Sequence, residues 1–144
     1  MPKIIEYKKA ITPQNTYELR DVEGTELCTI GDTTYFAIPG TVLPTGQAAE
    51  IQSSIRATTM DDVLNDQIRA ASPHCQLINS RRRQRLLDAG YSADDQDYFI
   101  HLHIAMQIGA VPANAKRTAT LAAYVEAFKV AYLWAESQYA ALGL

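Results

Sequence analysis

The segment ELCTIGDTTYFAI, residues 26–38, decides the β-rich part of the fold. β-Branched and aromatic residues flank the dipeptide Gly31-Asp32, and such runs on both sides of a two-residue loop are typical of a β-hairpin. Glycine at the first loop position suits a type II′ turn, because that position requires a positive φ angle. Pro39-Gly40 follows directly and predicts the end of the second strand. The segment therefore predicts one antiparallel hairpin.

Further β structure is expected only upstream of this hairpin. Lys3–Tyr7 has the composition of a short strand, and the polar stretch 12–15 that follows predicts an irregular connection. Downstream, Pro44 and Gly46 mark a change of character, because the apolar spacing becomes helical after them. We therefore expect a β-rich part over residues 1–43 and a helical part over residues 44–144.

The first two helices are expected soon after this boundary. Residues 47–56 carry apolar side chains at helical spacing, including Ile51 and Ile55. A second helix over residues 59–71 has Thr59 as its expected N-cap and the carboxylates of positions 61–62 in its first turn, where they complement the helix dipole.

The third and fourth helices have clear start signals. Ser72-Pro73 predicts the start of a helix over residues 74–89, and Gly90 predicts its end. Ser92, followed by aspartates, predicts the N-cap of a helix over residues 92–107. Apolar residues surround this fourth helix almost completely, so we expect it to be central.

The chain is expected to end in a long amphipathic helix over residues 116–142, where apolar residues recur every three or four positions. No sequence repeat or linker separates a second domain, and 144 residues suffice for one core of ordinary size. The predicted fold is α+β and mainly α. It comprises a single domain over residues 1–144 in which a short hairpin or small sheet precedes a four- to five-helix bundle.

Composition and charge exclude several classes of protein. The chain is 47% apolar and 20% charged, which argues against disorder, and its net charge of −3 gives no overall attraction to nucleic acid or anionic membranes. Cys28 and Cys75 are far apart in sequence, which favours reduced thiols, although one disulfide remains open. Charged residues interrupt the N-terminus and every long apolar stretch, so we expect a soluble protein without a signal peptide or a transmembrane segment.

No specific catalytic, cofactor or metal signature is present. The histidines and cysteine at positions 74, 75, 101 and 103 lack zinc-ligand spacing, because His101 and His103 would point to different sides of a helix. On a strand they would share a face, which leaves a metal site open only under that alternative. Asp94, Asp95 and Asp97 lack the glycine and terminal glutamate of an EF-hand and are expected to cap a helix. Glycine-rich phosphate loops are missing, so we expect no cofactor and no enzyme activity, although a catalytic triad could assemble from distant positions.

A cluster of arginines on the third predicted helix is the most unusual local feature. Four guanidiniums fall within five positions, at Arg81, Arg82, Arg83 and Arg85. Arginine suits bidentate contacts to carboxylates or phosphates, so the cluster indicates a protein partner or a nucleic acid. Two plainer interpretations stay open, a solvated helix face and internal pairing with nearby aspartates.

Aromatic side chains on the last predicted helix form a second candidate interface. These residues are Tyr124, Phe128, Tyr132, Trp134 and Tyr139. Tyrosine and tryptophan are favoured in protein interfaces because they bury a large area and keep a polar tip, although packing in the core is the more common use of such a helix face.

Two stretches carry a family resemblance. The run SPHCQLINSRR at residues 72–82 with LDAGYSADD at 87–95, and the later AYVE at 123–126 with Trp134, resemble small virion-associated proteins of tailed bacteriophages. After residue 97 the sequence departs from that pattern, because an apolar segment replaces the expected charged one. The resemblance implies a non-enzymatic structural or adaptor protein of the tail, baseplate, neck or fibre attachment.

Such an adaptor would be located in the virion, and its partners would be other virion proteins and possibly further copies of itself. The arginine cluster, the aromatic helix and the edge of the Gly31-Asp32 hairpin are the natural contact surfaces for it. The alternative is an accessory protein that binds nucleic acid through residues 81–85, and it predicts a strong dependence of binding on salt.

Overall fold

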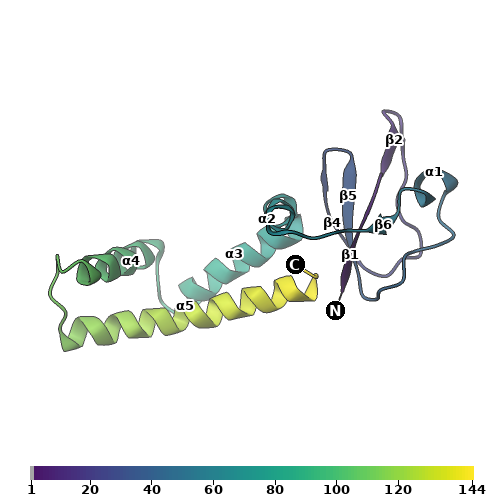
Figure 1. The fold of residues 1–144 in the computed structure, drawn as a ribbon. Helices are drawn as coiled ribbons and strands as arrows, with labels where there is room; N and C mark the ends of the chain where they lie inside the picture. The colour runs from purple at the N-terminus through teal and green to yellow at the C-terminus, as the bar shows by residue number, and fades with distance from the viewer. Residues whose placement is uncertain (1) are drawn as a thin grey trace. The chain divides into compact units, whose positions relative to one another are not determined.

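The computed structural model describes residues 2–144 and divides the chain into two compact units. The first unit comprises the residues up to Ile78 together with Ser137–Leu144, and the second comprises Asn79–Glu136. A small N-terminal sheet is followed by helices (Figure 1), so the predicted mixed α+β class with a larger share of helix is confirmed.

The first unit contains a four-stranded antiparallel sheet. Its strands lie in the order β4 (Thr25–Ile30), β5 (Thr33–Ile38), β1 (Lys3–Tyr7) and β6 (Arg56–Ala57). The predicted hairpin is confirmed as β4 and β5, with Ile30 opposite Thr33. Gly31 has a φ of 63°. Asp32 does not have a positive φ, because Asp21 is the only non-glycine residue of the described range 2–144 that has one. The turn therefore has the type II′ pattern expected from its first glycine.

Alternation along the strands places side chains on both faces of this sheet. Ile4 and Tyr35 lie on one face with Ile68 of α2 (Asp62–Ala71). Their neighbours Ile5 and Phe36 lie on the other face, in a cluster with residues 51 and 55. Successive strand residues point to opposite faces, so both sides of the sheet are covered by apolar side chains.

Two sequence predictions about the first unit are wrong. The stretch around residues 12–15 is not irregular, because β2 (Ala10–Thr12) and β3 (Asn15–Thr16) pair as a short hairpin. The helix expected over residues 47–56 is reduced to α1 (Ala49–Gln52), and the chain then enters β6 beyond the predicted boundary at residue 43.

Sheet pairing explains the short helix. Ala57 lies opposite Ile5, and Arg56 both lies opposite Glu6 and forms an ion pair with it. Ile51 and Ile55 are buried in the apolar cluster, so their four-residue spacing reflects contact with the sheet rather than a continuous helix.

Helix starts follow the capping signals with one correction. The N-cap of α2 is Asp61, whose carboxylate accepts a 2.7 Å hydrogen bond from the Leu64 N–H, and not Thr59. Helix α3 (Pro73–Asp88) begins directly after Ser72 as predicted. Ser92 caps α4 (Ala93–Gln107) in a reciprocal capping box with Asp95, also as predicted.

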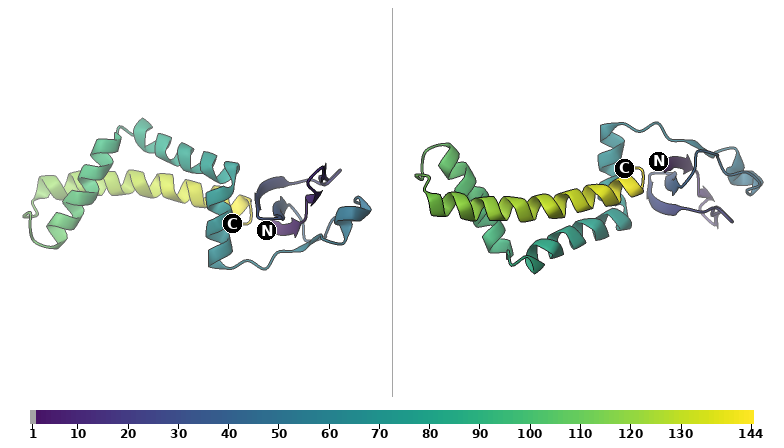
Figure 2. Two further views of the ribbon diagram at one scale, coloured as in Figure 1. Left: turned by 90° about the horizontal axis from the view of Figure 1, so that it is seen from above. Right: turned by 90° about the horizontal axis from the view of Figure 1, so that it is seen from below.

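The second unit is built from the end of α3, from α4 and from most of α5 (Ala115–Ala141). Both views of Figure 2 show α5 as one uninterrupted helix, with α4 crossing its N-terminal half. Phe99 and Leu102 of α4 pack against Tyr124 of α5. The expectation that α4 is central is wrong, because the apolar residues on its other side are exposed.

Candidate interaction surface

The four arginines of α3 do not form one surface. Successive helix residues are separated by about 100° around the axis, so Arg81 and Arg85 share a side of α3 whereas Arg83 lies on another. Arg81 and Arg83 are exposed, and Arg82 is half-buried. Arg85 stacks over the ring of Trp134, with 4.3 Å from its guanidinium carbon to the ring centroid. Three of the four arginines are therefore exposed, and one of these, Arg85, also contacts Trp134.

Internal pairing with aspartates does not account for these charges. Within residues 2–144, no ion pair joins the arginines of residues 81–85 to a carboxylate. Asp88 instead accepts a 2.8 Å hydrogen bond from the Gln84 amide, and Asp95 is occupied by the capping box at Ser92. The exposed guanidiniums thus remain available for a partner or for solvent.

The predicted aromatic set is partly interior. Tyr124 is buried, and its ring stacks on Phe99 with 5.0 Å between centroids while the Tyr91 ring meets it edge-on. Burial raises the pKa of the Tyr124 hydroxyl, the Asp97 carboxylate raises it further, and the Arg82 guanidinium opposes both. Tyr124 is therefore a core residue of the second unit and is not part of its surface.

The remaining aromatics occupy different positions. Phe128 and Tyr132 are exposed and stacked with 6.1 Å between their centroids, which continues the row of rings outward from Tyr124. Tyr139 lies in the first unit, where it is buried beneath the Arg69 guanidinium at 4.2 Å from its ring centroid. Of the five aromatic residues predicted as an interface, only Phe128, Tyr132 and part of Trp134 can therefore belong to a surface of the second unit.

An exposed apolar stripe on α4 is the feature that sequence reasoning missed. Ile100, Ile104 and Ile108 follow one another at four-residue spacing and are half or more exposed. Four-residue spacing places Ile100 and Ile104 along one side of α4, and Ile108 follows them as its C-cap. The sequence showed that these positions are apolar, but it did not show that they are exposed. Phe99 and Leu102 are the residues of α4 that are buried. We call these three residues the α4 stripe.

Exposed apolar side chains are concentrated in the second unit. Fourteen large apolar residues are exposed within residues 2–144, and ten of them fall within Asn79–Glu136. The ten are Leu87, Tyr98, Ile100, Ile104, Ile108, Val125, Phe128, Val130, Tyr132 and Leu133. Single exposed apolar residues are normal, whereas larger exposed apolar patches mark interaction sites, so we expect an interaction site to lie in the second unit.

The histidines and cysteine that were weighed as metal ligands do not form a cluster with other ligating side chains. In the described part of the chain, no group of three or more histidine, cysteine, aspartate or glutamate side chains could hold a metal ion. His101 and His103 lie on a helix, as predicted, and the His101 Nδ1 atom is 2.7 Å from the Asp97 carbonyl oxygen. Cys28 and Cys75 are buried free thiols, and burial raises the pKa of both.

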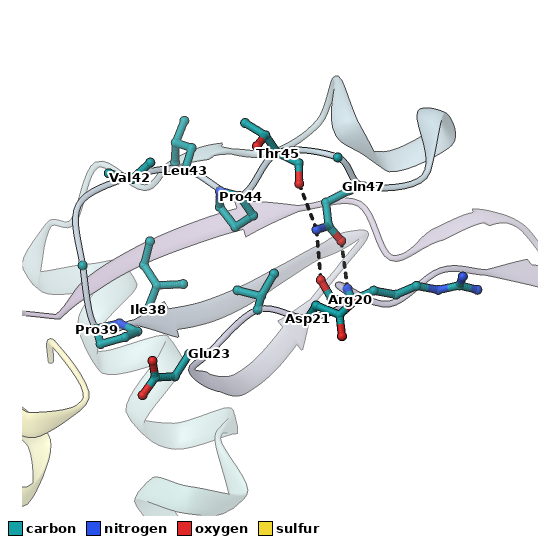
Figure 3. Close-up of a pocket in the computed structure, with 13 residues that line it drawn as sticks. Arg20, Asp21, Glu23, Ile38, Pro39, Val42, Leu43, Pro44, Thr45 and Gln47 are labelled. Carbon is teal, nitrogen blue, oxygen red and sulfur yellow. Dashed lines mark hydrogen bonds between the residues drawn. The ribbon is translucent and has the colours of Figure 1, made fainter.

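The first unit has a shallow surface pocket of about 510 Å³ beside the end of β5. Gln47 connects two segments that line this pocket. The Gln47 side chain accepts a 2.8 Å hydrogen bond from the Arg20 N–H and donates to the carbonyl oxygens of Arg20 and Thr45 (Figure 3). Asp21, with a φ of 53°, turns the chain at this point. The side-chain amide of Gln47 thus forms its hydrogen bonds with backbone groups and stabilises the loop.

A polar network lies on the same unit. The Tyr7 hydroxyl is 3.5 Å from the Glu26 carboxylate, and the Lys9 ammonium lies 3.0 Å from both Glu26 and Glu18. Burial and then the Glu26 charge raise the pKa of Tyr7 to about 12, against the opposing effect of Lys9. The contact between Tyr7 and Glu26 links the side chains of β1 and β4.

Comparisons with known proteins found no matching family model, no similar curated protein and no similar solved structure. No helix among the described residues is both long and apolar enough to cross a membrane.

Proposed function

We propose that this chain is a non-enzymatic structural adaptor of a tailed-phage virion, acting through protein–protein contacts of its second unit in the tail, baseplate or fibre attachment. The observation that carries the proposal is the concentration of ten exposed large apolar side chains within Asn79–Glu136. Exposed apolar side chains in such numbers favour association with another protein, because association removes their apolar area from water.

The composition of the surface favours a protein partner. Exposed tyrosine and phenylalanine at Tyr98, Phe128 and Tyr132 lie in the same unit as exposed arginines at positions 81 and 83. Aromatic residues and arginine are enriched at the centres of protein interfaces. The phage assignment itself comes from the resemblance of residues 72–95 and 123–134 to virion-associated proteins. The four- to five-helix bundle expected from the sequence belongs to the same proposal, because helices of a partner protein would pack against the exposed helix faces of the second unit and complete such a bundle.

Binding to nucleic acid is the second candidate function. It is favoured by Arg81 and Arg83, which are exposed and lack a carboxylate partner within the described range. Their placement on different sides of α3 limits the number of phosphates that one duplex could present to them. The net charge of −3 also gives no general attraction to a polyanion.

Two variants separate the candidates. The double variant Ile104→Lys/Ile108→Lys removes exposed apolar surface. The double variant Arg81→Glu/Arg83→Glu removes two exposed positive charges. Mass spectrometry of phage particles from the strain that encodes the chain should find the wild-type protein at a fixed copy number. It should find the Ile104→Lys/Ile108→Lys variant much depleted.

The arginine variant serves to test the alternative. Absolute mass by light scattering, with and without a short DNA duplex at low and high salt, should show no DNA complex for the wild-type chain. A duplex complex that forms at low salt and disappears in the arginine variant would establish nucleic-acid binding instead. Absence of the chain from purified particles would refute the virion assignment.

A further inference from the structure

A groove lies between α3 and α5 of the second unit, and none of the α4 stripe residues lines it. Its volume is about 630 Å³. Most of its lining is apolar, formed by Ala89, Ala123, Ala127, Val130 and Ala131. Alanine leaves room for the large side chains of an opposing helix, so the groove can accept apolar residues from a partner.

The length of the groove fits a short helix. On α5 the lining runs from Ala123 to Ala131, and a rise of about 1.5 Å per residue over this stretch gives about 12 Å. An opposing helix of about two turns spans that length, and it can place two large side chains four residues apart along the groove. Val130, which is 58% exposed, lines the groove and can contact such side chains.

Carboxylates lie on both walls of the groove. Asp88 belongs to the α3 wall and Glu126 to the α5 wall. Asp88 is also the last residue of α3, where the C-terminal end of the helix dipole adds partial negative charge. The 3.8 Å ion pair between Glu126 and Lys129 is exposed on both sides and contributes little. The two carboxylates therefore attract a cation that enters the groove.

Arg85 also lines the groove, but its position is set by another contact. Its guanidinium carbon lies 4.3 Å from the centroid of the Trp134 ring. Within residues 2–144, Arg85 forms no ion pair with Asp88 or Glu126. The lining thus combines apolar side chains with two carboxylates and one guanidinium, and this net negative charge is complementary to a basic amphipathic helix.

We propose that an amphipathic helix of another protein occupies this groove, with large apolar residues over the alanines and a lysine or arginine between Asp88 and Glu126. This occupant deepens the proposed adaptor role, and it rests on that role only in treating the second unit as a surface for another protein.

Fluorescence anisotropy with two labelled helical peptides provides the test. Both peptides are about four turns long and carry leucine at the same four-residue spacing. They differ only in having lysine or glutamate at the flanking positions. The wild-type chain should bind the lysine peptide at least about tenfold more tightly, because the groove carboxylates attract one peptide and repel the other. Equal affinities, or a preference for the glutamate peptide, would overturn the proposal.

Exchange of charge locates the binding in the groove. The double variant Asp88→Lys/Glu126→Lys should reverse the preference, so that the glutamate peptide binds more tightly. Glu23→Lys/Asp66→Lys is the matched control, since it makes the same change in net charge at exposed positions of the first unit. The control should keep the preference for lysine. A groove variant that still prefers lysine, or a control that loses the preference as well, would refute the site.

Filling the groove tests its apolar part. Ala123→Leu adds a large side chain at an exposed position of the lining, so it should weaken binding of the lysine peptide at least about tenfold. Ala122→Leu is its matched control, because Ala122 is exposed on α5 outside the lining. Circular dichroism should show the wild-type helix content for both variants. Equal binding by the two variants would contradict the proposal.

Light scattering of the wild-type chain without peptide tests a second copy as the occupant. A dimer that Ala123→Leu dissociates would show that the groove binds the chain itself, which would overturn the proposal. A chain whose mass is the same with and without Ala123→Leu agrees with it. These results are independent of the adaptor role, which is judged by the presence of the chain in phage particles.

Discussion

Replacing Leu102 by alanine should destabilise the second unit strongly, whereas the same change at Ile104 should not. Leu102 is 8% exposed and packs with Phe99 and Tyr124, while Ile104 is 51% exposed on the opposite side of the same helix. The pair tests directly which side of α4 is buried. It also tests the statement that the α4 stripe is a free surface rather than part of the chain's own core.

The expected magnitudes follow from burial. Leu102→Ala removes three carbon atoms from the core, which costs about 2.4 kcal/mol in transfer free energy at about 0.8 kcal/mol per methylene. The remaining cavity raises the loss of unfolding free energy to about 3 kcal/mol. Ile104→Ala loses only part of a half-exposed side chain and gains helix propensity, so its cost should stay below about 1 kcal/mol.

Urea denaturation of both variants supplies the measurement, with circular dichroism for the whole chain and Trp134 fluorescence for the second unit. The protein should be dilute enough to be monomeric, because an assembled partner would also cover Ile104. Equal losses at Leu102 and Ile104 under those conditions would refute the exposure of the α4 stripe. They would restore the expectation, drawn from the sequence, that α4 is central.

Three further predictions concern caps, titration and loop structure. Ser92→Ala should lower the free energy of unfolding by about 1 kcal/mol. Because Ser92 holds the pKa of Asp95 below its usual value, NMR titration of this variant should show a higher pKa for Asp95. In the wild type, the contribution of Asp95 to the free energy of unfolding should be lost as pH falls through this lowered pKa. Tyr7 should ionise near pH 12 in the folded protein. The free energy of unfolding should therefore fall as pH rises from 10 to 12, because the unfolded chain loses the tyrosine proton at lower pH than the folded chain does. A Tyr7→Phe variant with the same pH dependence would contradict this. Gln47→Ala should speed hydrogen exchange at the Arg20 amide without changing exchange in the β4–β5 hairpin, and unchanged Arg20 exchange would show that Gln47 does not hold the loop.

Local signals were sufficient where the chain's own neighbours determine the structure. The Gly31-Asp32 turn, the Ser92 cap and the Gly90 stop each depend on backbone geometry within a few residues, and each could be read correctly from the sequence. The short α1 could not, because the pairing of Arg56 with Glu6 joins positions 50 residues apart. Helical spacing in residues 47–56 was compatible with either outcome.

The surface was harder to predict than the fold. An arginine run reads as one patch in a linear sequence, but helix geometry distributes Arg81 and Arg83 around α3 and places Arg85 on Trp134. Similarly, apolar residues surrounding α4 indicate burial only if neighbours exist on every side. The described chain supplies them on the Phe99 side alone.

The two units use their apolar residues in opposite ways, and this difference suggests a measurement that separates the functional alternatives. The first unit covers both faces of its sheet, whereas the second leaves ten large apolar side chains exposed. Assembly driven by that surface depends on burial of apolar area, so salt should leave it largely unchanged or strengthen it. Phosphate binding by Arg81 and Arg83 would instead weaken steeply as salt rises. The salt dependence of any complex therefore identifies which surface holds it, even before the partner is known.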